Sequence, residues 1–261
     1  MTSAAHTQRA LVLWRRVESD VRLFLGAVGF LLLCIMTRHF GLLGPNWLLE
    51  IGGDWRVYHD AALRFLDGRS YFTPDQLAPA HVLTYGDVLY PPTALWLFVP
   101  MALLPPIVWH LVPVLVAGAA LWRLRPSAWG WVGIAWLAAW PVGPCYLYSG
   151  NPLTWAVACL FAAVAWDVPA SLLLLMPSLL PFAFYRCNRR RWWLGLLALV
   201  LLSLPLLSLN ITWLRVILGT SGTGGPLYGI RDWPTMCIPL VAAASATRRV
   251  GRTVAGPAGP P

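Results

Sequence analysis

Long stretches without a charged residue constrain this chain more than any other feature. No Lys, Arg, Asp or Glu occurs in residues 23–37, 88–122, 126–166, 168–185 and 192–214. Hydrophobic residues make up 58% of the chain and charged residues 11%, which is more apolar surface than a soluble fold can bury. A helix of about 20 apolar residues crosses a bilayer. The sequence therefore predicts an all-α, polytopic (multi-pass) protein of the cell membrane.

Prolines and glycines divide the longest runs into shorter segments, because they interrupt helices. Counting the segments gives about eight predicted crossings, near residues 21–43, 88–104, 107–122, 128–147, 152–166, 169–185, 193–214 and 233–247. The predicted organisation is a cytoplasmic N-terminal segment (1–20), a multi-span membrane domain (21–247) and a disordered cytoplasmic tail (248–261).

Basic residues lie between the apolar runs and set the expected orientation. With the N-terminus in the cytoplasm, eight crossings put the basic segment 186–191 on the cytoplasmic side, as the positive-inside rule requires. Arg123 and Arg125 fall outside under this order and are exceptions to the rule. The net charge of +9 is expected to meet membrane lipids, and nucleic acid is not an expected partner.

Metal and disulfide chemistry are not indicated by the cysteines. The chain has five of them, mostly within apolar runs and without the spacing of metal ligands. We therefore expect no metal site and no cofactor.

A polar segment, residues 44–89, interrupts this apolar pattern after the first predicted span. It holds six of the ten acidic residues, namely Glu50, Asp54, Asp60, Asp67, Asp75 and Asp87. Within it, residues 55–66 have the spacing of a short amphipathic helix lying on the bilayer surface. A plain connection between spans is usually much shorter, and long loops are often functional. We expect 44–89 to be an extracytoplasmic loop of catalytic type.

Asp54 is the candidate for chemistry in this loop. It follows Gly52-Gly53 at the expected mouth of the first span, with Arg56 close by. A carboxylate beside a cation at a partly dry membrane rim is suited to general-base catalysis. A solvated loop aspartate is the alternative reading of the same residue, and the same holds for His59 and Asp60.

Several short motifs of the chain resemble those of a known enzyme family. They are DWRVYHDAA at 54–62, YPP at 90–92, LLP at 103–105 and, more weakly, Gly150-Asn151. In this order they resemble glycosyltransferase family 87, the polyprenol-phosphate-mannose-dependent alpha-mannosyltransferases of the GT-C superfamily. The resemblance implies a GT-C-like bundle of about eight transmembrane helices with a long first extracytoplasmic loop.

The resemblance also implies a reaction. Asp54 takes the place of the family's catalytic base, and the implied activity is inverting transfer of a sugar, mannose in the family, from a polyprenyl-phosphate donor. The acceptor is a lipid or glycan outside the membrane. The candidate substrate-binding residues are Arg56, Tyr58, His59, Tyr90 and Arg231. The two arginines suit the donor phosphate, because a guanidinium can fork onto its oxygens.

Departures from the family pattern keep other functions open. Met176 stands where a basic residue commonly precedes the proline, and Asn151 and Leu153 replace the Gln and Asn of the Gly-Gln-x-Asn motif. A truncated or degenerate, non-catalytic relative is one alternative. A small-solute transporter is another, although transporters place ionisable residues in mid-membrane rather than in a loop.

Overall fold

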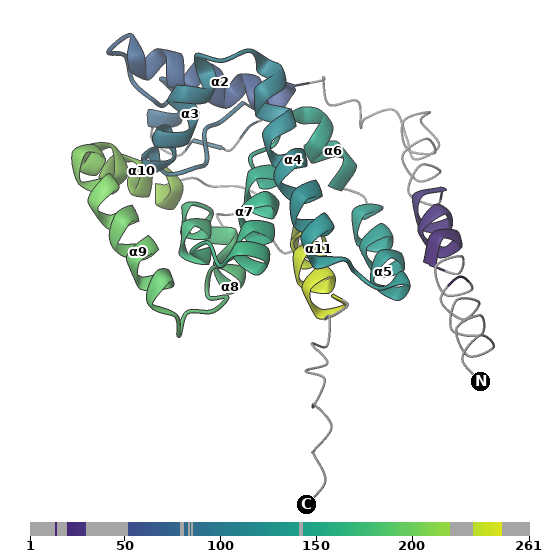
Figure 1. The fold of residues 1–261 in the computed structure, drawn as a ribbon. Helices are drawn as coiled ribbons and strands as arrows, with labels where there is room; N and C mark the ends of the chain where they lie inside the picture. Colours follow the sequence, from purple (N-terminus) through teal and green to yellow (C-terminus); the bar gives the residue numbers. More distant parts are fainter. Residues whose placement is uncertain are drawn as a thin grey trace, which may run out of the picture.

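The computed structural model describes residues 14, 20–29, 52–78, 81–82, 84, 86–140, 143–219 and 232–246 (Figure 1). These residues form helices and turns, with one isolated bridge between Pro126 and Ala246 and no strand among them. The all-α prediction is confirmed for this part of the chain. Most of the predicted segments 1–20 and 248–261 lies outside the described residues.

The helices follow one another with short connections. The α-helices are α2 (Gly53–Leu66), α3 (Leu95–Ala102), α4 (Pro106–Leu124), α5 (Ala128–Ala138), α6 (Gly143–Ser149), α7 (Leu153–Trp166), α8 (Leu180–Ala183), α9 (Arg190–Ser203), α10 (Leu207–Gly219) and α11 (Trp233–Ala244). The 3-10 turns are η2 (Asp75–Leu77), η3 (Pro92–Ala94), η4 (Ala170–Leu175), η5 (Pro177–Leu179) and η6 (Leu204–Leu206).

Helices α4, α5, α7 and α11 form the centre of the bundle. α7 packs against α4 and α11, and α11 also packs against α5 (Figure 1). Phe161 of α7 is almost completely buried between these helices, and Leu160 is buried in a cluster with residues of η4, η5 and α8. The central helix α7 is therefore surrounded by protein over much of its length.

One end of the bundle, here called the Asp54 end, carries α2, α3, α10 and the turn between α6 and α7. The indole of Trp109, in the first turn of α4, donates to the carbonyl of Gly150 over 2.7 Å. The indole of Trp213 in α10 donates to the carbonyl of Leu89 over 2.9 Å, and that of Trp96 in α3 donates to Leu202 over 2.9 Å. These bonds join the start of α4 to the turn between α6 and α7, α3 to the end of α9, and α10 to the end of the polar loop.

The opposite end, here called the arginine end, collects the other termini of the same helices. Arg123, near the end of α4, donates to the carbonyl of Ala165 near the end of α7 over 2.7 Å. Asp167 follows α7 and pairs with Arg186 at 2.8 Å, just before α9 begins. At the same end of the bundle, the backbone of Ser127 before α5 donates to Ser245 after α11.

Two contacts show that eight alternating crossings are wrong. That order puts Asp54 and Asn151 on opposite sides of the membrane, yet their side chains are hydrogen bonded at 2.9 Å. It also separates Asp167 from Arg186, which form an ion pair. Residues on opposite sides of a hydrocarbon core about 30 Å thick cannot touch.

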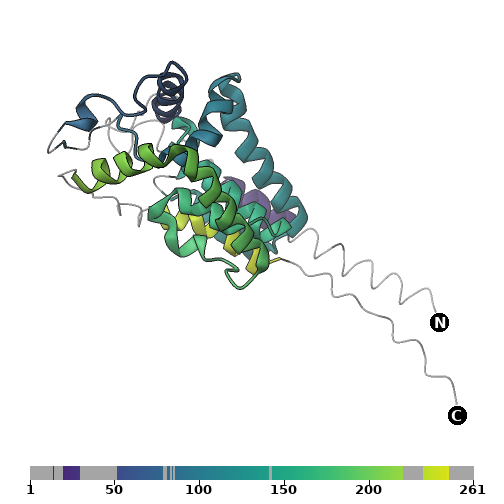
Figure 2. The same ribbon diagram turned by 90° about the vertical axis from the view of Figure 1, so that its left-hand side faces the viewer.

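The helix lengths explain where the count failed. Segment 88–104 holds only η3 and the short α3, and segment 169–185 breaks into η4, η5 and α8 at its prolines. Segment 128–147 divides into α5 and α6. Within the described residues, Pro106–Leu124 and Arg190–Leu218 are long and apolar enough to cross a membrane, which supports membrane association. The second is bent at η6, which contains Pro205 (Figure 2).

Gly130 sets how closely α5 approaches α11, and its replacement tests this packing. A Cβ on Gly130 would overlap both Oγ and Cβ of Ser245. Gly130→Ala should therefore lower the stability of the protein in detergent by about 1–3 kcal/mol, because a serine Cβ cannot move away. Thermal unfolding measures the change.

Gly118→Ala in α4 is the matched control, since a Cβ there meets no atom within 4 Å. Alanine is the better helix former, so this variant should be as stable as the parent or slightly more so. Equal stability of both variants would contradict the close α5–α11 contact.

Candidate active site

Gly52, the residue before helix α2, has a backbone conformation that favours glycine. Gly52 has φ of +69°, a left-handed conformation that side chains disfavour, and its N–H donates to the carbonyl of Tyr148 over 3.1 Å. The amphipathic helix predicted for 55–66 is confirmed and extends over Gly53–Leu66. Tyr58, Ala61 and Ala62 form its buried face, and α2 packs against α3.

Asp54 lies in the first turn of α2 and is bound by the turn between α6 and α7. Its Oδ2 accepts from the hydroxyl of Ser149 at 2.6 Å and from the side-chain amide of Asn151 at 2.9 Å. The carboxylate is half-buried, and the N-terminus of a helix stabilises negative charge. Among the described residues, its Oδ1 accepts no hydrogen bond. One oxygen is thus held in place while the other remains open to a further donor.

Gly150 allows this close approach between α2 and the turn. Its φ is +73°, and a Cβ there would lie 2.8 Å from both His110 Cε1 and Trp55 Cβ. Asn151 uses both ends of its amide, because its Oδ1 also accepts from the backbone of Leu153 at the start of α7. The orientation of the Asp54 carboxylate is therefore fixed by α4, α6 and α7 together.

The other predicted substrate residues occupy different surroundings. Arg56 is exposed on α2. The ring of Tyr58 packs against Tyr90 and Phe98, with ring centroids 5.0 Å apart in each pair. The predicted substrate residues Tyr58 and Tyr90 therefore belong to the aromatic core under α2. The ring of His59 packs at an angle of 34° against Trp55 and bonds to Asp60 at 3.0 Å. Arg231 lies outside the described residues.

A small cavity lies beside these rings. It is lined by Trp55, Tyr58, His59, Phe98, Met101, Ala102 and Trp109 and has a volume of about 10 Å³. This volume holds about one water molecule and no sugar ring.

The loop after α2 is held by buried side chains that its sequence did not single out. The Gln76 amide donates to the carbonyl of Val88 and accepts from its N–H, as a neighbouring strand would. The hydroxyl of Tyr71 donates to the carbonyl of Tyr90. Burial raises the pKa of Tyr71, and nearby Arg64 opposes this shift in part, so the phenol stays protonated.

A second carboxylate is bound to α6. The hydroxyl of Tyr146 donates to Asp232 at 2.6 Å, and both side chains are buried. Tyr146 precedes Ser149 by one turn of the same helix, so α6 contacts Asp54 at its end and Asp232 near its middle. Tyr146 and Ser149 belong to no motif or spacing that would identify them as site residues from the sequence. Within the described residues, no group of His, Cys, Asp or Glu could hold a metal ion.

Comparison of the chain with protein families, curated proteins and solved structures finds no match.

Ser149 tests whether the turn holds the Asp54 carboxylate. Ser149→Ala removes a completely buried hydroxyl and one of two donors to a charged acceptor, so it should lower stability by about 1–3 kcal/mol. Thermal unfolding in detergent measures the loss. Ser208→Ala, at an exposed position of α10, is the control and should change stability by less than about 0.5 kcal/mol. A loss of the same small size in both variants would contradict the role of the Asp54–Ser149 bond.

Proposed function

We propose that this protein is a multi-pass membrane glycosyltransferase that uses a polyprenyl-phosphate sugar, with mannose as the expected sugar. It transfers the sugar with inversion to a lipid or glycan acceptor outside the membrane. Asp54 acts as the general base.

The observation that carries the proposal is the hydrogen bonding of Asp54 to Asn151. Two motifs of the resemblance, one at 54–62 and one at 150–151, meet at a single carboxylate although 97 residues separate the bonded partners. A solvated loop aspartate needs no such support, whereas a catalytic base needs a fixed orientation. The geometry therefore favours the catalytic reading of Asp54 over the alternative of an ordinary loop residue.

The proposed step uses Oδ1 of this carboxylate, to which no described residue donates. Asp54 Oδ1 takes the proton of the acceptor hydroxyl while the acceptor oxygen bonds to the anomeric carbon of the sugar. The bond from that carbon to the phosphate oxygen breaks, and the polyprenyl phosphate leaves with its electron pair. Arg56, exposed two residues beyond Asp54, is suited to the growing phosphate charge. Arg231 is the second candidate for this role.

Met176 favours a second candidate function, because it stands where the family commonly has a basic residue and is buried in an apolar cluster. A non-catalytic relative would keep the fold and the bonds of Asp54 without binding the donor. The same assay distinguishes the two, because only the transferase forms a glycosylated product.

Asp54→Asn is the direct test of the proposed base. The change is nearly isosteric and keeps a hydrogen-bond acceptor for Ser149, but the amide cannot take a proton. Transfer of radiolabelled mannose from polyprenyl phosphate to an envelope lipid extract should fall by about 10²- to 10⁴-fold.

Asp60→Asn is the internal control for this assay. Asp60 lies on the same helix with the same charge, but it is exposed and contacts His59 rather than the turn. Its variant should keep near-normal activity at matched expression. Equal, near-normal activity of both variants would remove Asp54 as the base, and a parent protein that forms no glycosylated product would favour the non-catalytic relative.

A further inference from the structure

We infer that the arginine end is a cytoplasmic membrane interface that binds anionic lipid headgroups, and that the chain crosses the bilayer six times between Asp20 and Ala246. This inference depends on the proposed membrane location but not on the transferase chemistry.

Exposed tryptophans mark the arginine end. Trp122, Trp129, Trp166 and Trp193 are 78%, 76%, 39% and 60% exposed. They lie at the end of α4, the start of α5, the end of α7 and the start of α9. Large exposed indoles are unfavourable in water, but Trp is enriched where a membrane protein passes through the headgroup layer. Four helices therefore carry the same interfacial residue at the same level.

The charge at this end complements anionic lipid. Its described ionisable groups are Asp20, Arg22, Arg123, Arg125, Asp167, Arg186, Arg189, Arg190 and Arg191. Seven arginines and two aspartates leave an excess of five positive charges. Asp167 neutralises part of it by pairing with Arg186 at 2.8 Å and Arg191 at 3.7 Å. Basic clusters beside a membrane are attracted to the anionic lipids of the cytoplasmic leaflet.

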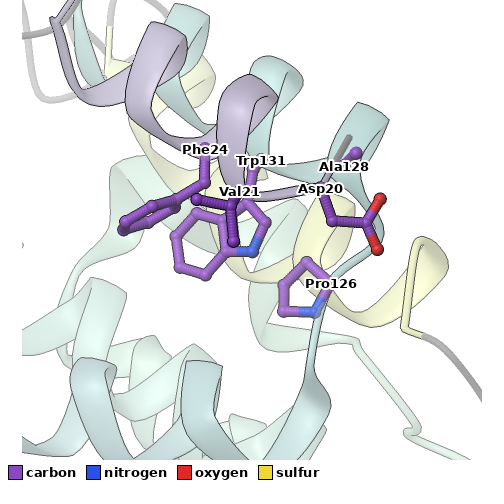
Figure 3. A pocket seen from close by; sticks show the side chains of 6 residues that line it. All are labelled: Asp20, Val21, Phe24, Pro126, Ala128 and Trp131. Carbon is purple, nitrogen blue, oxygen red and sulfur yellow. The ribbon is translucent and has the colours of Figure 1, made fainter. Parts of the chain in front are cut away.

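Residues 20–29 belong to the same end at their start. Asp20, Val21 and Phe24 lie against Pro126, Ala128 and Trp131 around a cavity of about 260 Å³ (Figure 3). The rings of Phe24 and Trp131 pack edge to face with centroids 5.1 Å apart, and the Asp20 carboxylate points away from them. The helical segment thus begins beside the start of α5 and runs in the same direction.

Apolar side chains cover the surface between the two ends. On α4 the exposed ones include Leu111, Val114 and Leu115, and on α9 they include Leu194, Leu197, Val200 and Leu201. The apolar faces would contact the acyl chains of a bilayer, and the neighbouring tryptophans and arginines would contact its headgroups. The short helices α7 and α11 need not span the full lipid thickness, because they pack inside the bundle.

Following the chain between its two ends gives the crossings. Asp20 lies at the arginine end and Gly52 at the Asp54 end, so the chain passes from one end to the other between them. The segments α4, α5 with α6, α7, α9 and α11 each connect the two ends as well. Segment 92–102 begins and ends at the Asp54 end, and 170–183 begins and ends at the arginine end. Six crossings place Asp20 and Ala246 on the same side of the membrane, the arginine side, and put Arg123 and Arg125 there too. All the arginines of this end then obey the positive-inside rule.

Cysteine labelling tests the orientation. In a cysteine-free background, Arg125→Cys and Asp75→Cys are treated with a membrane-impermeant maleimide in intact and permeabilised cells. We expect labelling of Asp75→Cys in intact cells, and labelling of Arg125→Cys only after permeabilisation. Labelling of Arg125→Cys in intact cells would overturn the inference. Release of the whole protein by alkaline carbonate would instead refute the membrane location, and neither outcome depends on enzyme activity.

Vesicles of defined composition test the lipid contact. Purified protein is reconstituted in phosphatidylcholine with or without phosphatidylglycerol, and its Tm is compared. The double variant Arg189→Gln with Arg190→Gln should lose about 4–8 °C of the stabilisation by phosphatidylglycerol. Arg69→Gln, an exposed arginine at the Asp54 end, is the control and should keep it. An equal gain in Tm for the parent and both variants would overturn the headgroup contact.

Discussion

The bonding of the Asp54 carboxylate to the turn between α6 and α7 is the constraint on which the rest of the structure depends. It joins the polar loop to the centre of the bundle through Ser149 and Asn151. The same turn is bound from α4 by Trp109 and approached by His110, and it leads directly into α7. A half-buried charge held in this way stabilises the structure only if all its partners are in place. The carboxylate therefore ties the loop, α4, α6 and α7 to one another.

The fold separates its polar chemistry into two ends with different character. The Asp54 end contains buried polar groups in specific pairs, such as Gln76 with Val88 and Tyr71 with Tyr90, beside exposed charges such as Arg56. The arginine end leaves its charges and tryptophans exposed, with Asp167 as the main internal partner. Specific buried pairs position a site for chemistry, whereas exposed cations and indoles suit a fluid surface of lipid. This difference distinguishes the two ends of the bundle.

The two proposals depend on different observations and can fail separately. The transferase proposal depends on the oriented carboxylate of Asp54 and on the motifs around it. The orientation proposal depends on which helix ends lie together, as shown by Arg123 with Ala165 and Asp167 with Arg186. A non-catalytic relative with the same six crossings would satisfy the second and refute the first.

The sequence by itself determined the helical class, the apolar character and the helix over 55–66, because these follow from local composition and periodicity. It also singled out Asp54. It did not determine the number of crossings, because an apolar run interrupted by prolines has the composition of a span whether or not it connects the two ends of the bundle. The runs 88–104 and 169–185 do not connect them. Nor did it reveal Ser149 and Tyr146, single polar residues in an apolar run. Only the tertiary structure decided which ends and which side chains meet, because contacts across about 95 residues leave no local pattern in the chain.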